Sequence, residues 1–129
     1  MIEKDEIHLW VQRAEEDYQL SVSALRHKQP LTYGATFHDQ QCAEKYLKAL
    51  LLFNNVSFPR THDLAALSDL CQHTGIILPI NDDELERLSA YAVEVCYPGM
   101  QPTVEEAKDA LRIAAIVRKF SGKILNKKT

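Results

Sequence analysis

The chain has 129 residues, enough for one domain whose core needs neither a metal ion nor a disulfide to hold it together. With 46% hydrophobic and 26% charged residues it has the composition of a folded globular protein, which excludes a disordered or fibrous chain. A net charge of -3 argues against a protein that coats nucleic acid non-specifically, but it leaves room for a local basic patch. We therefore expect one domain over residues 1–129.

The sequence gives no sign of a membrane or secretory segment. Its apolar runs are all shorter than the ~20 residues that a membrane-spanning helix needs, and the charged start from Met1 to Glu6 differs from a signal peptide. Its three cysteines form no CxxC pair, which favours packed, reduced thiols. We therefore expect a cytoplasmic location.

Five prolines divide the chain into segments with helical periodicity. Proline lacks a backbone donor and clashes with the preceding helical turn, so a helix is expected to stop before each one. The segments cover about 5–28, 33–55, 62–74, 82–97 and 103–126, and in each the apolar residues recur every three or four positions. The run from Gly75 to Ile80 is short and contains a proline, so it is expected to be a loop.

Local signals mark where three of these helices begin. Thr61 is expected to cap the third helix and Asp82 the fourth, while Thr103 with Glu106 matches a capping box for the fifth. Long helices joined by short loops favour antiparallel neighbours. The predicted fold is all-α: an antiparallel, up-and-down four-helix bundle with an additional short helix.

The second predicted helix carries a polar stripe. Gln41, Glu44 and Lys48 are spaced i, i+3, i+7, and Asp17 of the first helix lies beside an apolar face. A buried acid needs a partner, and Lys48 or a donor at a helix end is expected to supply it. Two interpretations follow: an interhelical salt-bridge network that fixes packing, or a polar groove that binds a phosphate or a base.

Other chemical motifs are weak or absent. Arg60 and His62 precede the third helix, where backbone donors favour an anion. His38 and Cys42 have the spacing of a zinc half-site, but no second ligand pair accompanies them, so we predict no metal and no cofactor. Nucleophile elbows and phosphate-binding glycine loops are also missing. Tyr97 precedes a proline, which places its hydroxyl at the end of the bundle.

Four motifs in order resemble the HEPN domain, over roughly residues 5–125. They are Trp10-x3-Ala14-x2-Asp17, Gln41-Cys-Ala-Glu44-Lys45-Tyr-Leu-Lys48-Ala-Leu-Leu51, Thr61-His62-Asp63-Leu64-x2-Leu67 and Tyr91-Ala-Val-Glu-x2-Tyr97-Pro98. The resemblance implies a helical bundle, commonly a homodimer, that associates with a small nucleotidyltransferase, often in a toxin–antitoxin pair. It also implies that some relatives are metal-independent RNases.

The RNase signature of that family is an arginine followed four to six residues later by histidine. None of the six arginines in this sequence has a histidine in that window. Similar relatives often carry arginine just before the Tyr-Pro pair, where this chain has Cys96. Without that guanidinium the sequence lacks a clamp for phosphate, which favours a non-catalytic binding member.

Three functional hypotheses follow. The first is a homodimeric binding module for a nucleotidyltransferase partner and a nucleotide or RNA ligand, and its candidate groove residues are Asp17, Gln41, Glu44, Lys48, His62 and Tyr97. The second is an RNase with an atypical site, in which His62 is the general acid or base and Arg60 stabilises phosphate charge. The third is a purely structural homodimer.

Overall fold

The computed structural model describes residues 4–94 and 101–126. In these ranges the chain forms five α-helices and no β-strand: α1 (Lys4–Arg26), α2 (Thr32–Phe53), α3 (Leu64–His73), α4 (Asp82–Glu94) and α5 (Val104–Asn126). The prediction of an all-α fold is confirmed, and the described helix boundaries lie close to those expected from the prolines and the apolar periodicity. The predicted end of the fourth helix at residue 97 lies outside the described residues.

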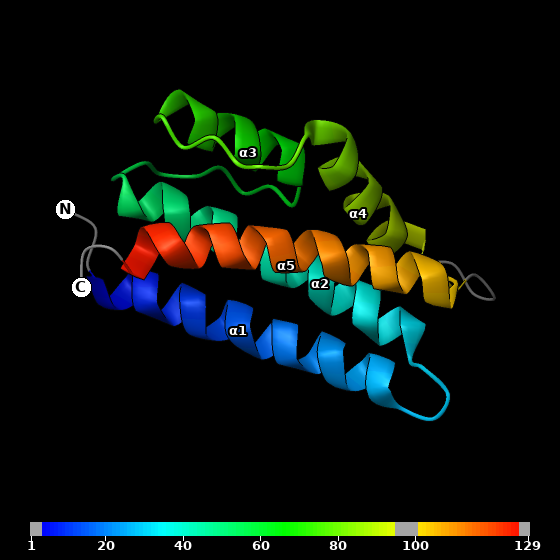
Figure 1. Ribbon diagram of the computed structural model, residues 1–129. Coiled ribbons are helices and arrows are strands. Elements are labelled where there is room, and N and C mark those ends of the chain that lie inside the picture. The colour runs from blue at the N-terminus through cyan, green and yellow to red at the C-terminus, as the bar shows by residue number, and fades with distance from the viewer. Residues whose placement is uncertain (1–3, 95–100, 127–129) are drawn as a thin grey trace.

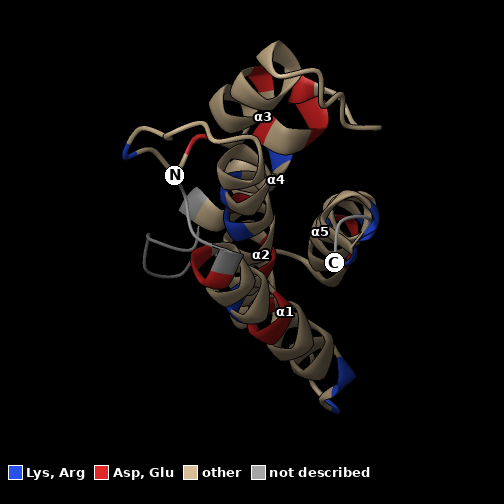
Figure 2. Ribbon diagram, turned by 90° about the vertical axis from the view of Figure 1, so that its left-hand side faces the viewer, with Lys and Arg blue, Asp and Glu red and all other residues tan. Residues whose placement is uncertain are grey.

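The helix α2 is the central element of the bundle. Helices α1, α2, α4 and α5 alternate in direction, and the short α3 runs the same way as α2 (Figure 1). Helix α1 packs along one side of α2 and α5 along another, while α3 and α4 follow each other along a third (Figure 2). This arrangement confirms the up-and-down four-helix bundle with an additional short helix.

The capping predictions for α3 and α5 had different outcomes. The Asp63 carboxylate accepts a hydrogen bond from the Ala66 backbone N–H at 3.2 Å, so Asp63 is the N-cap of α3 and the choice of Thr61 was wrong. The Thr61 hydroxyl instead accepts a bond from the N–H of Asp63, the residue that precedes the first residue of α3. At α5 the capping box is confirmed, because Thr103 and Glu106 each accept a bond from the other's N–H.

The loop between α3 and α4 lacks regular structure, as expected from its proline. Gly75 takes a positive φ of 92°, a conformation that favours glycine after the end of a helix. At the other end of the loop the Asn81 side chain accepts a bond from the Glu84 N–H at 2.8 Å. Asn81 therefore caps α4, and the expectation that Asp82 would do so was wrong because Asp82 is already the first helical residue.

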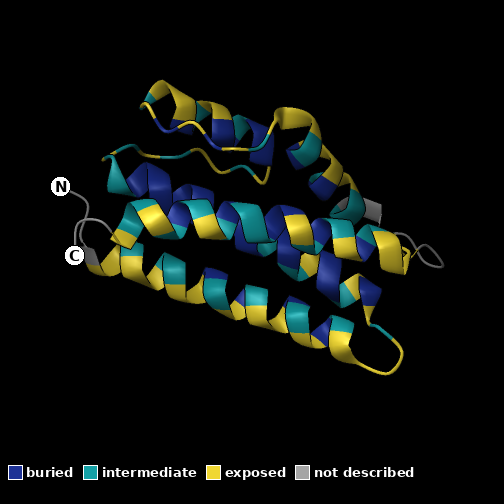
Figure 3. Ribbon diagram, viewed as in Figure 1, coloured by how far each residue is buried: buried dark blue, intermediate teal, exposed yellow. Residues whose placement is uncertain are grey.

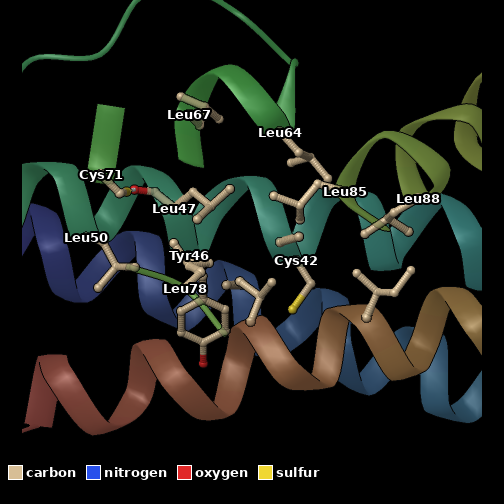
Figure 4. Packing of buried hydrophobic residues seen from close by; sticks show 14 of the residues in the cluster. Cys42, Tyr46, Leu47, Leu50, Leu64, Leu67, Cys71, Leu78, Leu85 and Leu88 are labelled. Atoms are coloured by element: carbon tan, nitrogen blue, oxygen red, sulfur yellow. Dashed lines mark hydrogen bonds between the residues drawn. The ribbon is translucent and has the colours of Figure 1, made fainter. Parts of the chain in front are cut away.

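The core lies where α2 meets the other four helices. Figure 3 shows the buried stretches of each helix turned towards α2, with exposed residues on the outside. Leucines from α2, α3 and α4 interlock in this region, and the Tyr46 ring points from α2 towards α5 (Figure 4). The largest apolar side chains that are fully buried are Leu47, Leu50, Leu51, Leu64, Leu67, Leu85, Leu88, Ile113 and Val117.

In the described ranges, every helix falls short of the length or the apolar character that a membrane span requires.

Candidate functional site

Asp17 forms the centre of one buried ionic cluster between α1 and α2. Its side chain is only 9% exposed, and its two oxygens accept hydrogen bonds from His38 Nδ1 at 2.8 Å and from Lys45 Nζ at 2.5 Å. His38 and Lys45 are two turns apart on α2, so both reach the same carboxylate. The expectation that Lys48 would pair with Asp17 was therefore wrong, because Lys45 and His38 already do so.

Glu44 forms the centre of a second cluster, between α2 and the loop before α3. Its side chain is 5% exposed, and its carboxylate accepts bonds from Lys48 Nζ and from His62 Nδ1, each at 2.9 Å. His62 belongs to the loop that precedes α3, and its side chain is 84% exposed. Because Nδ1 is bonded to the Glu44 carboxylate and the side chain is exposed, the other ring nitrogen, Nε2, is accessible to solvent.

The Lys48 ammonium group is enclosed by aromatic rings as well as paired with Glu44. Its Nζ lies 5.6 Å from the Trp10 ring centre and 5.3 Å from the Phe58 ring centre. The two rings contact each other edge to face, with centres 5.7 Å apart. Two aromatic faces and one carboxylate together replace much of the water that this ammonium group loses on burial.

The two neighbouring glutamines of α2 have different roles. Gln41, a predicted site residue, is half-buried, and its side chain makes no hydrogen bond to a described residue. Gln40, which the sequence analysis missed, donates to the His62 carbonyl at 3.1 Å and accepts from the Ser89 hydroxyl at 3.2 Å. Gln40 therefore ties the loop before α3 to α2 and α4. Only the packing of these elements singles it out, because its contacts lie in the loop before α3 and in α4, far from it in the sequence.

The structure thus brings some of the predicted site residues together. Glu44, Lys48 and His62 are in direct contact, whereas Asp17 belongs to the neighbouring cluster around His38 and Lys45. Tyr97 lies outside the described residues. Arg60 is exposed and forms no ion pair with a described residue, so it is not part of either cluster.

Three arginines are held by carboxylates of the same chain. Arg87 and Arg112 both bond to Asp109, at 2.7 Å and 3.1 Å. Arg118 forms a two-pronged pair with Glu15 at 2.7 and 2.9 Å. In the described part of the chain, each of these three guanidinium groups is thus paired with an aspartate or a glutamate.

The Glu15–Arg118 pair belongs to a cluster that the sequence analysis also missed. The Arg118 guanidinium lies 4.2 Å from the Tyr18 ring centre, and the Tyr46 hydroxyl donates to Glu15. The hydrogen bonds from Arg118 hold the pKa of Glu15 below its usual value. Burial, and next the bond to Glu15, raise the pKa of Tyr46, so its hydroxyl keeps its proton.

His38 and Cys42, which have the spacing of a zinc half-site, do not face a shared ligand. Cys42 is fully buried and burial raises the pKa of its thiol, while His38 is bonded to Asp17. Among the described residues there is no group of three or more histidine, cysteine, aspartate or glutamate side chains placed to hold a metal ion.

Asp39 is a buried acid of a different kind. Its side chain is fully buried on α2, and neither of its oxygens has a hydrogen-bond partner among the described residues. Burial raises the pKa of Asp39 to about 7. A carboxyl group in this position is partly protonated near neutral pH.

The fold and these clusters define a small helical-bundle protein whose buried charges are mostly paired within the chain. The family model for the HEPN domain matches residues 7–125, nearly the whole chain. The chain therefore belongs to the HEPN domain family. Comparisons with curated proteins and with solved structures give no match.

Proposed function

We propose that this HEPN-domain protein is a non-catalytic binding module. It acts as a homodimer, pairs with a minimal nucleotidyltransferase in a two-gene, toxin–antitoxin-like system, and presents a nucleotide-binding groove on α2. Membership of the HEPN family supports this proposal.

The observation that carries the non-catalytic assignment is that arginine side chains are paired with carboxylates of the same chain. RNA cleavage needs a base or acid next to a cation that neutralises the phosphate in the transition state. Here Arg87 and Arg112 are bonded to Asp109, and Arg118 is bonded to Glu15, so these three guanidinium groups are already neutralised by carboxylates of the same chain. The sequence also lacks the arginine–histidine spacing of the RNase members.

The proposed groove uses Asp17, Gln41, Glu44, Lys48, His62 and Tyr97. Gln41 is half-buried on the same face of α2 as Lys48, and its amide has no partner among the described residues. An amide can donate to and accept from the edge of a base, while the exposed nitrogen of His62 is available to a phosphate or ribose. The bond to the buried Glu44 carboxylate fixes the position of His62.

Two binding measurements test the proposal. The chain should co-elute in size-exclusion chromatography with a nucleotidyltransferase encoded by the neighbouring gene, and isothermal titration with ATP, GTP and a short RNA should show binding to at least one. Gln41→Ala should weaken that ligand binding about tenfold. Gln72→Ala, on the exposed face of α3, is the matched control and should bind like the wild type. Elution alone together with no heat of binding would contradict the proposal.

One observation favours the RNase alternative. A carboxylate on Nδ1 and an exposed opposite nitrogen are the arrangement of a general base, and His62 has both through Glu44. In that reaction Arg60, two residues away, would stabilise the phosphate charge. RNA cleavage in EDTA that disappears in His62→Ala would support this alternative.

The third reading is a purely structural homodimer. Sedimentation equilibrium that shows a dimer, combined with no ligand and no partner in the binding measurements, would favour it over both other functions.

A further inference from the structure

A groove between α1 and α5 is lined by none of the described residues of the proposed nucleotide site. Both helices pack on α2, and the groove between them has a volume of about 930 Å³. Its size falls in the range of pockets that hold small organic molecules. Its apolar lining includes Ile7, Val11, Tyr18, Tyr46, Phe53 and Ala115.

The space exists because α5 presents small residues there. Ala115 and Gly122 are two turns apart on the same face of α5, and both line the groove. A Cβ atom added at Gly122 would meet no other atom within 4 Å. The groove is therefore open at this position, and a larger side chain at Gly122 would fill it without displacing the core.

One wall of the groove is rigid and carries no net charge. Arg118 lines it, with its guanidinium held by two bonds to Glu15 and stacked over the Tyr18 ring at 4.2 Å. The Tyr46 hydroxyl also bonds to Glu15. These contacts fix flat aromatic and guanidinium surfaces before any ligand arrives, which lowers the entropy cost of binding a flat molecule.

The rim of the groove carries the charge that the wall lacks. Lys119 and Lys123 are exposed, one turn apart on α5, and form no ion pair with a described residue. The α1 side of the rim carries Asp5 and His8. Two ammonium groups against one carboxylate leave a net positive rim above an apolar floor, and such a rim attracts an anion.

We propose that the α1–α5 groove binds a small organic anion that has a flat aromatic or apolar body. The body lies on the floor between Val11, Tyr46 and Ala115, and the carboxylate, sulfonate or phosphate is held by Lys119 and Lys123. This inference is independent of the proposed function, because it uses none of the residues of that site.

A fluorescent probe with this chemistry, 8-anilinonaphthalene-1-sulfonate, tests the proposal on the full chain. The wild type should bind one probe molecule per chain with micromolar affinity. Gly122→Leu should weaken binding at least tenfold because the leucine occupies the groove. Gly34→Leu is the matched control: Gly34 is also a helical glycine with nothing within 4 Å of an added Cβ, but it lies on α2 outside the groove. It should bind like the wild type.

The charge of the rim is tested separately. Exchanging Lys119 and Lys123 together for glutamine should weaken binding of the anionic probe about tenfold and reduce its dependence on salt. The same double variant should bind the uncharged analogue N-phenyl-1-naphthylamine as well as the wild type does. Lys108→Gln, another exposed lysine of α5, should leave both affinities unchanged.

Competition then distinguishes the sources of such an anion. Displacement of the probe by AMP identifies a nucleotide, and displacement by decanoate identifies an acyl carboxylate; either supports the proposal. Displacement by neither would overturn it. Equal probe affinity in Gly122→Leu and wild type would also overturn it, as would a change in oligomeric state by sedimentation in Gly122→Leu, which would make the groove an interface between copies.

Discussion

Asp39 and Glu44 are two acids on the same helix, five residues apart, and both are almost completely buried. Glu44 accepts bonds from Lys48 and His62, whereas the oxygens of Asp39 have no partner among the described residues. We call the group of Glu44, Lys48 and His62, where α2 meets the loop before α3, the ionic seam. The side of α2 that holds Asp39 contains a carboxyl group without a counterion.

The difference shows that burial alone does not determine the role of a charged residue in this bundle. Glu44 links α2 to the loop before α3 through its two partners, so its charge is used to hold elements together. Burial of Asp39 raises its pKa to about 7 and makes its ionised form costly to the fold. One acid stabilises the bundle as an anion, and the other is best tolerated as a neutral acid.

The largest expected effect is a pH dependence of stability that comes from Asp39. Its pKa is about 7 in the folded protein and near its ordinary value of 3.8 in the unfolded chain. The folded state therefore holds the proton more tightly, and stability falls as pH rises from about 4 to about 7, then levels off. The free energy of unfolding should drop by about 4 kcal/mol over this range from this group alone.

Urea unfolding of wild type and Asp39→Asn at a series of pH values measures this term. Subtracting the two curves removes the contributions of all other groups, including Glu15 and Asp109, whose lowered pKa values act in the opposite direction. The free energy of unfolding of the wild type minus that of Asp39→Asn should fall as pH rises from about 4 to about 7. Parallel curves for the two proteins would show that Asp39 is not an uncompensated acid.

The second prediction concerns the ionic seam. Lys48→Met keeps most of the side-chain volume but leaves the buried Glu44 without its ammonium partner, so it should destabilise the protein by about 3 kcal/mol in urea unfolding. Lys108→Met is the matched control, because Lys108 forms an exposed pair with Glu105 at 4.0 Å. It should change stability by less than about 0.5 kcal/mol. Equal effects of both substitutions would remove the distinction between seam and surface.

A smaller effect is expected for the half-exposed partner of Asp17. His38→Gln removes one of the two donors to Asp17, but Lys45 remains bonded to the same carboxylate. The loss should be about 1 kcal/mol in thermal or urea unfolding. A loss as large as that of Lys48→Met would mean that His38, and not Lys45, is the main partner of Asp17.

The fold could be predicted from the sequence because prolines and apolar spacing act locally. The same holds for the capping box of Thr103 and Glu106, where both bonds form within one turn. The choices of Thr61 and Asp82 failed by one or two residues, since several neighbouring side chains at each helix start are able to accept the same backbone bond.

The partners across the bundle could not be predicted in the same way. Asp17 pairs with Lys45 and not Lys48 because the register between α1 and α2 decides which lysine reaches it, and one sequence does not contain that register. Gln40 and the Glu15–Arg118 pair were missed for the same reason, as the two members of that pair are 103 residues apart. Asp39 was missed because what distinguishes it is the lack of a hydrogen-bond partner for its buried carboxyl group, and the sequence does not show which side chains surround it.

The non-catalytic assignment is tested most directly by incubating the pure protein with labelled RNA in EDTA, beside His62→Ala. We predict the same intact RNA in both reactions at every time point. Product formation by the wild type that His62→Ala abolishes would contradict the account, because it would show that the pairing of His62 with Glu44 prepares a base for catalysis.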